Sequence, residues 1–465
     1  MNSETARARE LYAISPYTVD PHLLRCVARV KRAAARCNLT LGYLDEERGV
    51  AIRNAAGRLI EMGDRELASA FPIDAFQGGA GTSTNMAVNE WIGEHAGADP
   101  HGEVNLHQST NDVMPTALRI LMHDRLEDLE LACEELQGEL QRGEEKYDLY
   151  IKSGRTELRD AVTTSLGREY ATWAHGISRD RWRCFKARER IREVPLGGTA
   201  IGTGAGAPRS YVLKVVRFLQ EEVDHPISRA EHLVEATSNQ DQLVEAMDAP
   251  KCLAVNLRRI ASDIRLLASG PRRGFGELAL PDLLPGSSIM AGKVNPVIPE
   301  AVIQAAERIL ANDGYLSRLA AMTELELNAF FPAIAHTIQE SLHLAIGATR
   351  CLTAYTAKLK PTLLEKSATV EAEAVALLPV ASYRECEQLS VAALEAGVSL
   401  SEYLVRAGAL DEEIAGRLFD PANLLALGYD EALYRELREG WGEKLRAVIE
   451  GVGGRNLPEE ASDER

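Results

Sequence analysis

The chain has 465 residues, of which 45% are apolar and 26% charged, and this composition excludes a largely disordered protein. Its formal net charge of −17 argues against a nucleic-acid partner, because phosphate binding needs clustered Lys and Arg, although a local cationic pocket can still hold an anionic small molecule. Only 5% of the residues are aromatic, which favours helices over sheets, and the length predicts more than one structural section.

The N-terminal segment and the cysteines indicate where the protein works. The segment MNSETARARELYAISPY lacks the apolar stretch of a secretory signal, and no run reaches the roughly 18 apolar residues of a membrane span. The seven cysteines are scattered without a CxxC pair, which is typical of reduced thiols. We therefore expect a cytoplasmic protein with no membrane partner. No paired His or Cys spacing suggests a metal site.

The first predicted section is helical and covers residues 1–111. The apolar pattern is helical over 21–62, with a second helix opening at Asp45. A glycine-rich loop, QGGAGTSTN at 77–85, follows, and the next helical stretch, 86–93, is short. This order predicts an N-terminal helical domain.

Long helices dominate the expected central section, residues 112–364. After QSTND at 108–112, leucines recur at helical spacings, which predicts one long helix with a single buried stripe. Further helices, separated by Gly- and Pro-rich loops, are expected at 160–192, 211–223, 240–269, 296–312 and 321–358. Because these segments exceed the average helix length of roughly 11 residues, they predict a helical bundle.

The last expected section, residues 365–465, has shorter helices. Gly397 and Gly408 are candidate C-caps, and Asp420-Pro421 predicts a break between helices. The final stretch, GVGGRNLPEEASDER, is expected to form a mobile tail.

The segment PGSSIMAGKVNPVIPE at 285–300 carries the most chemistry. Glycines flank the adjacent hydroxyls of Ser287 and Ser288, and Lys293 and Asn295 stand just before a helix start. Glycines let a loop fold over a ligand, while a cation and an amide can hold a carboxylate. Spacing alone favours a simpler interpretation, a capped helix start after a flexible turn.

This segment resembles the signature loop of the fumarase/aspartase superfamily, an all-helical group of homotetrameric lyases that release fumarate from succinyl-type substrates. Other segments resemble the family in the same order: QGGAGTSTNMAVNEW at 77–91, QSTNDVMPTALRI at 108–120, SGRTELRDAV at 153–162 and LGGTAIGTGAGAP at 196–208. The resemblance extends from about Pro21 to Pro421. It implies an all-α, three-section lyase fold whose long central bundle builds a tetramer core.

The resemblance is strongest to the aspartase and class II fumarase branches. The strings AIGTGAGAP, ATSNQD and SGPRRGFGEL are more similar to aspartase. They imply an ammonia-lyase that needs no cofactor and eliminates ammonia from L-aspartate or a related amino acid to give fumarate. Its active site would combine residues from three subunits of a homotetramer.

Carried over by position, the resemblance makes Ser287 the general base that removes a proton beside a substrate carboxylate. Because a serine hydroxyl is a poor base at its ordinary pKa, the loop must stabilise the alkoxide with backbone N–H groups and a cation. The resemblance implies a substrate-binding set: Lys293, Asn295 and Thr156 at the α-carboxylate, Thr82, Ser109 and Thr110 at the other carboxylate, Asn111 near the leaving amino group, and Ser288 in the serine loop. Each has a structural alternative, since Thr82 and Ser109 can be helix N-caps and Lys293 a surface charge.

Glu157 departs from the family pattern, which usually has histidine or glutamine there. In fumarases that histidine pairs with a glutamate matching Glu300 and handles the departing water. If Glu157 faces Glu300, both belong to the catalytic set, and a substrate ammonium would balance two carboxylates, which favours C–N cleavage. Alternatively, Glu157 turns outward to Arg155 or Arg159 and does no chemistry.

Other departures and alternatives stay open. Ala291 replaces a proline in the serine loop, and the stretch between Glu90 and Gln108 is shorter than usual, so the accessory dicarboxylate site of fumarases is expected to be absent.

The alternatives to an ammonia-lyase are a fumarate hydratase with a protonated Glu157, a lyase acting on an N-substituted aspartate, and a pseudoenzyme scaffold. The glycine-rich strings lack the strand and the Lys-Ser/Thr of a nucleotide loop, so no nucleotide is expected.

Overall fold

The computed structural model describes residues 4–362 and 369–453, and its elements are mostly helices. In chain order they are α1 (Glu4–Leu11), α2 (Pro21–Thr40), α3 (Glu46–Glu61), α4 (Asp64–Ala70), η1 (Gly79–Gly81), α5 (Thr82–Ala96), η2 (Pro100–Val104), α6 (Thr110–Lys146), β1 (Ile151–Thr156), β2 (Arg159–Ser165), α7 (Leu166–Arg190), β3 (Glu193–Val194), α8 (Arg209–Gln220), β4 (Ser228–Arg229), α9 (Leu233–Ser238), α10 (Asp241–Leu267), β5 (Leu278–Ala279), α11 (Val297–Ala320), α12 (Phe331–Thr356), β6 (Lys360–Pro361), α13 (Val370–Ala374), η3 (Val375–Leu377), α14 (Tyr383–Ala396), α15 (Leu400–Arg406), α16 (Glu412–Leu418), α17 (Pro421–Leu424) and α18 (Glu431–Gly453). The predicted all-α class is confirmed, because the strands are few and short.

Contacts divide the chain into two compact units. The first unit contains Met1–Gln137 and Gly176–Leu359, and the second contains Gly138–His175 and Lys360–Arg465. The three sections expected from the sequence, residues 1–111, 112–364 and 365–465, stay a prediction. The expected boundary at 364/365 and residues 454–465 of the expected tail lie outside the described residues, whereas the first three residues of that tail, 451–453, are the end of α18.

Short helices form one end of the first unit, and their starts follow from local capping. Asp20 caps α2 by accepting a 2.7 Å hydrogen bond from the backbone N–H of His22, and Asp45 caps α3. Leu24 and Val27 of α2 are fully buried. The two helices predicted over 21–62 are therefore confirmed.

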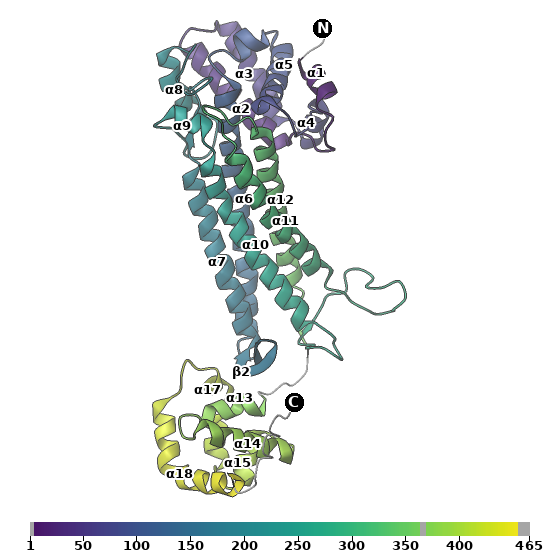
Figure 1. The fold of residues 1–465 in the computed structure, drawn as a ribbon, viewed down its shortest axis with the longest axis vertical. Coiled ribbons are helices and arrows are strands. Elements are labelled where there is room, and N and C mark those ends of the chain that lie inside the picture. Colours follow the sequence, from purple (N-terminus) through teal and green to yellow (C-terminus); the bar gives the residue numbers. More distant parts are fainter. Residues whose placement is uncertain (1–3, 363–368, 454–465) are drawn as a thin grey trace, which may run out of the picture. The chain divides into compact units, whose positions relative to one another are not determined.

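The long helices α6, α7, α10, α11 and α12 run side by side through the rest of the first unit (Figure 1). The predicted leucine stripe of α6 is buried, at Leu118, Leu121, Leu129, Leu136 and Leu140. Polar contacts add to this packing, because Asn312 of α11 donates to Glu340 Oε2 and Ser341 Oγ of α12 at 2.8 and 3.0 Å. The predicted bundle is confirmed.

Several predicted helix boundaries are wrong: α5 covers 82–96 rather than 86–93, and α11 continues to Ala320 rather than ending at 312. Residues 160–165 form strand β2, which pairs antiparallel with β1 from Ile151↔Ser165 to Thr156↔Arg159. The β-branched residues Val162, Thr163 and Thr164 favour that strand over the first turns of a helix. α12 begins at Phe331 rather than near 321, because the Asn328 side chain donates to Leu319 O at 2.9 Å and so closes the end of α11.

The second unit contains the β1–β2 hairpin with the adjoining ends of α6 and α7, and helices α13 to α18, with a core of its own. α18 has 23 residues, so not every helix of this section is short, although the sequence predicted short helices here. Leu389, Leu404 and Leu418 are fully buried in that core. Gly397 ends α14 in the left-handed conformation, at a φ of +68°, as the sequence predicts. Asp420 caps α17, which confirms the predicted break there.

A search of the described helices for a bilayer-spanning segment finds none with the necessary length and apolar character.

Candidate active site

The N-terminus of α6 carries three of the predicted substrate-binding residues and is held by a reciprocal cap. Ser109 Oγ accepts the N–H of Asn111 at 3.2 Å, and Asp112 Oδ1 accepts the N–H of Ser109 at 3.0 Å. Ser109 therefore caps α6, which is the structural role that the sequence predicted as the alternative to substrate binding. This bond uses an acceptor site of the hydroxyl, so its hydrogen can still be donated to a ligand.

Asp112 joins two loops that the sequence separates by more than 80 residues. Its Oδ2 accepts the N–H groups of Gly197 and Thr199 at 3.1 and 2.9 Å. Thr199 has a φ of +56°, a conformation that a β-branched residue adopts only when its surroundings enforce it. Burial raises the pKa of Asp112 to about 6, although these backbone bonds act in the opposite direction. Asp112 is therefore a buried anchor for both loops.

A second buried charge, Lys31 of α2, supports the same region. Its Nζ donates to Asn105 Oδ1 at 2.8 Å, and that oxygen also accepts from Asn85 and Asn89 of α5 at 3.3 and 3.1 Å. Burial lowers the pKa of Lys31 to about 7, while the carboxylate of Asp112 opposes that shift. The side-chain amide oxygen of Asn105 thus links α2 to α5. This link lies next to Thr110, which together with Thr82 and Ser109 is called the hydroxyl cluster below.

Thr82 and Thr110 are the first residues of helices α5 and α6. Thr82 opens α5 after Gly79, Ala80 and Gly81, which all have positive φ, and its Oγ1 donates to Gly79 O at 2.7 Å. Thr110 is buried, and its Oγ1 lies 3.3 Å from Asn85 Nδ2. Both helix starts offer backbone N–H groups and the positive end of a helix dipole, which favour a carboxylate.

Asn111 is oriented by the neighbouring glycine-rich loop. Its Nδ2 donates to Ala200 O at 2.8 Å. This bond fixes the amide, and it leaves Oδ1 able to accept a hydrogen bond from a ligand. The side chain therefore suits a donor such as an ammonium group.

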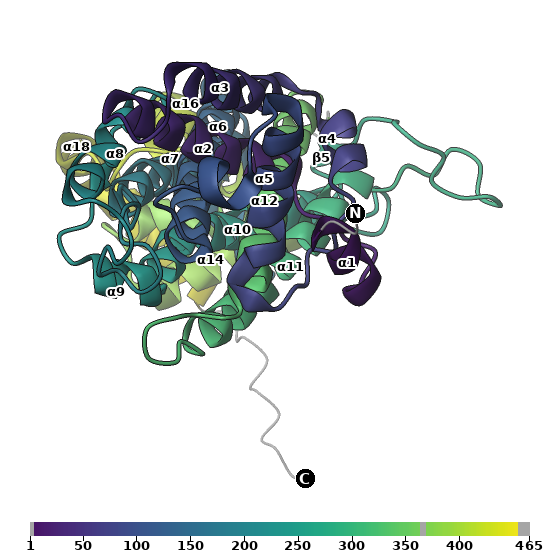
Figure 2. The same cartoon turned by 90° about the horizontal axis from the view of Figure 1, so that it is seen from above.

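The serine loop connects β5 with α11 and extends away from the helices of the first unit (Figure 2). Ser287 Oγ accepts two backbone N–H groups of this loop, from Ile289 at 3.2 Å and Met290 at 3.1 Å. A Cβ at Gly286 would lie 1.8 Å from Lys293 O, so this close approach requires glycine. The loop therefore holds its serine in a small ring of backbone donors.

The other predicted residues of this loop differ in exposure. Asn295 is half-buried, and its Nδ2 donates to Gly286 O at 2.6 Å, which fastens the two ends of the loop together. Lys293 and Ser288 are exposed. Ile289 is also 89% exposed, which is unusual for a large apolar side chain.

Within one chain, the serine loop and the hydroxyl cluster lie at opposite ends of α11. The loop precedes Val297, the first residue of α11, whereas Ala80 beside Thr82 donates to Ala329 O at 3.3 Å, beyond its last residue. A helix of 24 residues is about 36 Å long. Figure 1 also shows the loop leaving the bundle well away from α5. A single chain therefore does not bring Ser287 next to Thr82.

The remaining predicted residues fall in different units. Glu300 is half-buried in the first turn of α11, where its charge adds to the burial that raises the pKa of Tyr355 to about 12. Thr156 and Glu157 are exposed and belong to the hairpin of the second unit. Arg155 Nε lies 3.8 Å from Asp160 Oδ1 on the facing strand.

Asp112, Lys31 and Asn105 were not predicted from the sequence as residues of this site. Asp112 stands three residues after Ser109, and this S-x-x-D spacing before an apolar run is a recognisable capping box. Lys31 and Asn105 offered no such signal, because their partners lie far away in the sequence.

Comparisons with known proteins agree with this architecture. A lyase family matches residues 1–311. The aspartate ammonia-lyase of a Bacillus species is 35% identical over 438 residues, covering 90% of this chain and 92% of that protein. This chain belongs to the fumarase/aspartase superfamily of lyases. Its resemblance to that superfamily, inferred from the motifs, is confirmed.

Relatives within the superfamily differ in activity. The class II fumarate hydratase of Halobacterium salinarum is 36% identical over 442 residues, covering 92% of this chain and 93% of that protein. The solved structure of a fumarate lyase:delta crystallin from Brucella melitensis bound to cobalt, 36% identical, superposes with a TM-score of 0.86 over 91% of this chain and 95% of that chain. The comparisons therefore support a lyase without distinguishing an ammonia-lyase from a hydratase.

Proposed function

We propose that this lyase eliminates ammonia from L-aspartate, or from a close relative of it, and releases fumarate. The observation that carries the proposal is the environment of Ser287, whose Oγ accepts two backbone N–H groups. Such donors stabilise the negative charge of an alkoxide and lower the pKa of the hydroxyl, as a serine base requires. Lys293, six residues later, would add a cation to the same loop.

The proposed reaction begins with proton transfer to the Ser287 alkoxide from the carbon beside one substrate carboxylate. The electron pair moves into that carboxylate, giving an aci-carboxylate dianion, which Thr82, Ser109 and Thr110 would hold through hydroxyl and helix N-terminal donors. The C–N bond then breaks, the electron pair forms the double bond of fumarate, and the ammonium substituent departs as ammonia. Lys293 and Asn295 would hold the other carboxylate throughout.

Asn111 supports nitrogen as the leaving atom. Because its Nδ2 is engaged with Ala200 O, its oxygen is the group presented to a ligand. An ammonium group donates to such an oxygen, and so does an N-substituted amine. Glu157 and Glu300 would add negative charge near the nitrogen if neighbouring chains bring them together.

A fumarate hydratase is the second candidate, because the Halobacterium relative has that name at nearly the same identity as the aspartate ammonia-lyases. Hydroxide leaves poorly without a proton, so a hydratase would need a protonated acid, for which Glu157 is the candidate. A lyase for N-substituted aspartates and a pseudoenzyme scaffold are the other possibilities.

Fumarate absorbance tests the proposal directly. Pure protein is incubated with L-aspartate and, separately, with L-malate and N-substituted aspartates, and Ser287→Ala is the control. We expect fumarate from L-aspartate, with a loss of about a hundredfold or more in kcat for Ser287→Ala. Faster turnover of malate would favour the hydratase. No elimination from any of these compounds by folded protein would favour the pseudoenzyme.

We also infer that the working form is a homotetramer with composite sites. This follows from the separation of Ser287 and Thr82 within one chain and from the exposed apolar side chains of the serine loop. The cytoplasmic location stays a prediction from the sequence, and the free state of all seven cysteines agrees with a reducing compartment.

A further inference from the structure

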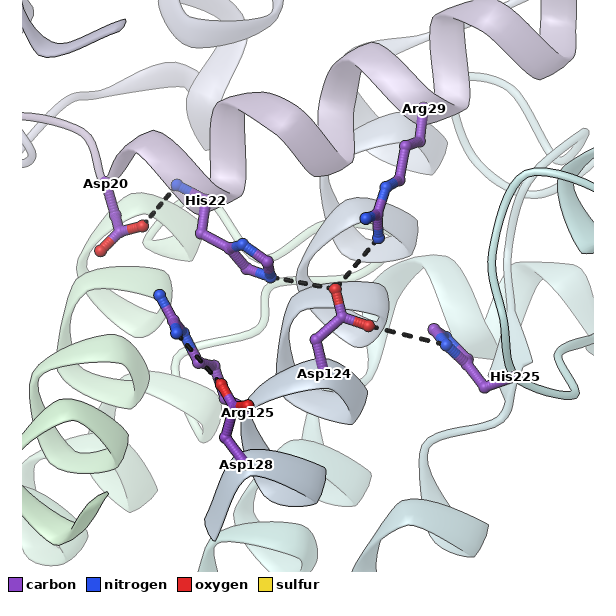
Figure 3. Close-up of polar contacts among 7 residues, drawn as sticks. All are labelled: Asp20, His22, Arg29, Asp124, Arg125, Asp128 and His225. Carbon is purple, nitrogen blue, oxygen red and sulfur yellow. Dashed lines mark hydrogen bonds and ion pairs between the residues drawn. The ribbon is translucent and has the colours of Figure 1, made fainter. Parts of the chain in front are cut away.

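A group of imidazoles around one carboxylate lies in the first unit (Figure 3), and none of its residues belongs to the proposed active site. Asp124 of α6 lies between His22 of α2 and His225, which follows α8. His22 Nε2 and Arg29 Nη1 each lie 3.0 Å from Asp124 Oδ2. The second carboxylate oxygen, Oδ1, lies 3.6 Å from His225 Nδ1. His123 stacks on His225 with ring centroids 3.7 Å apart.

Two imidazole nitrogens of this cluster have no hydrogen-bond partner in the described part of the chain: His123 Nδ1 and His225 Nε2. Both are enclosed: His123 is 7% exposed, and the side chain of His225 is 4% exposed. Leaving a buried polar atom without a partner costs free energy, so such an atom calls for an explanation. What distinguishes these two nitrogens from other unpartnered buried atoms is that they belong to stacked imidazoles beside one carboxylate, the kind of group that can coordinate a cation.

The donor atoms select the chemical class of that ligand. His123, Asp124 and His225 each offer one ligand atom, and these three atoms lie within 4.8 Å of one another. Two imidazoles and a carboxylate suit Zn²⁺, Co²⁺ or Ni²⁺, whereas Mg²⁺ and Ca²⁺ prefer oxygen ligands alone. We propose that His123, Asp124 and His225 bind one divalent transition-metal ion per chain.

The surroundings would both support and oppose such an ion. His22 and Arg29 hold Asp124 through its other oxygen, as groups behind a metal ligand commonly do. Arg29 also places a positive charge near the ion, so only strongly coordinating metals are expected to bind. The rings of His123 and His225 are 8° from parallel, and one must turn for both lone pairs to meet at a metal. The ion would then tie α6 to the segment after α8.

The experiment uses the full chain without an affinity tag, stripped of metal. Co²⁺ is titrated with visible absorption as the readout, and Zn²⁺ with calorimetry and thermal unfolding. We expect one ion per chain, d–d absorption that reports nitrogen ligands, and an unfolding midpoint that rises with Zn²⁺ concentration. Mg²⁺ should produce none of these effects.

Variants separate this site from histidines on the surface. His123→Ala and His225→Ala should each weaken Zn²⁺ binding by at least about tenfold, since even outer-shell partners have effects of that size. His175→Ala, which removes an exposed histidine, is the matched control and should bind like the wild type. Asp124→Asn, which keeps the side-chain shape, replaces any alanine variant whose circular dichroism shows misfolding.

Three results would overturn the proposal. The first is the absence of both the Co²⁺ spectrum and Zn²⁺ stabilisation at millimolar metal, in which case water satisfies the two nitrogens. The second is unchanged binding in the His123 and His225 variants. The third is equal stabilisation by Mg²⁺, which would indicate oxygen ligands elsewhere. None of these measurements depends on lyase activity, so the proposed function does not affect their outcome.

Discussion

Asp112 and Lys31 show how single buried charges position a polar site. Asp112 accepts three backbone N–H groups, from Ser109, Gly197 and Thr199, and so fixes both loops beside Asn111. Lys31 meets a shared amide oxygen instead of a carboxylate. Burial disfavours the charged form of both side chains. Such buried ionisable groups are costly in free energy and are more common at functional sites than elsewhere.

Replacing Asp112 by asparagine should damage stability and catalysis together. An amide oxygen cannot serve all three donors, and its NH2 group would face some of them. We expect a loss of about 2–3 kcal/mol in unfolding free energy and a fall in kcat/KM of at least about tenfold. Asp128→Asn, on the exposed side of α6, is the control and should have little effect. Equal behaviour of the two variants would rule out the anchoring role.

Lys31 should make stability depend on pH in a defined direction. Its pKa is about 7 in the folded chain and 10.5 ordinarily, so between these values the unfolded state binds more protons, and stability rises with pH. Lys31→Met lacks this contribution. The stability advantage of the wild type over Lys31→Met should therefore grow from pH 7 to pH 9, by up to about 1.4 kcal/mol per pH unit. Thermal unfolding of both proteins at three pH values checks this, and a constant difference would contradict it.

At the scale of elements, the serine loop and the β1–β2 hairpin depend on backbone conformation more than on packing. The neck of the serine loop is the place where Gly286 meets Lys293 and Asn295. It is closed because Gly286 has no Cβ and because Asn295 Nδ2 donates a hydrogen bond to Gly286 O. The hairpin turns through Glu157 and Leu158, which have φ values of +54° and +63°. Neither residue is a common choice for a turn with two left-handed positions, where Asn-Gly is preferred.

Gly286→Ala should reduce activity while leaving the fold intact. The new Cβ would displace Lys293 O and open the neck, whereas the exposed loop contributes little to the core. We expect a fall in kcat of at least about tenfold with an unfolding midpoint close to that of the wild type. Gly292→Asn is the control, because a Cβ there meets nothing within 4 Å and asparagine tolerates its φ of +77°. Full activity of Gly286→Ala would show that the neck has no role.

Leu158→Gly should stabilise the protein. Leu158 is 63% exposed, so the change removes left-handed strain with little loss of packing. The expected gain is about 1 kcal/mol, visible as a higher unfolding midpoint. Leu149→Gly is the comparison, because Leu149 is 65% exposed but lies outside the left-handed region. If both variants destabilise the protein equally, the turn is not strained.

At the scale of the whole molecule, each unit has its own core. The hydroxyl cluster and the serine loop both belong to the first unit, but they lie apart in it. The helices of the bundle carry the hydroxyl cluster and the serine loop at opposite ends of α11. Antiparallel bundles from neighbouring chains would bring unlike ends together, which is a simple way to complete the site in a symmetric oligomer.

Mixing two inactive variants tests this assembly. Ser287→Ala and Thr82→Ala chains, co-assembled in equal amounts, should regain about one quarter of the wild-type activity, because each site takes these residues from two chains chosen at random. Light scattering should give four chains per particle. Activity no higher than that of the separate variants would place both residues in one chain and contradict the composite site.

The fold class, the long helices and the superfamily could be predicted from the sequence. The helix start at Asp45, the leucine stripe of α6 and the serine-loop motif are local signals, because capping and helical periodicity act over a few residues. Strand β2 was missed for the same reason. Its pairing with β1 makes a β-branched stretch a strand, and nothing in that stretch alone excludes a helix.

Only the tertiary structure decided which distant residues meet. It placed Asp112 against Gly197 and Thr199, Lys31 against Asn105, and Asp124 between His22 and His225 (Figure 3). It also revealed that Ser287 and Thr82 lie apart in one chain. These facts depend on how helices of particular lengths pack, and burial then sets the pKa values and leaves some nitrogens without partners. Such long-range effects have no local sequence signal.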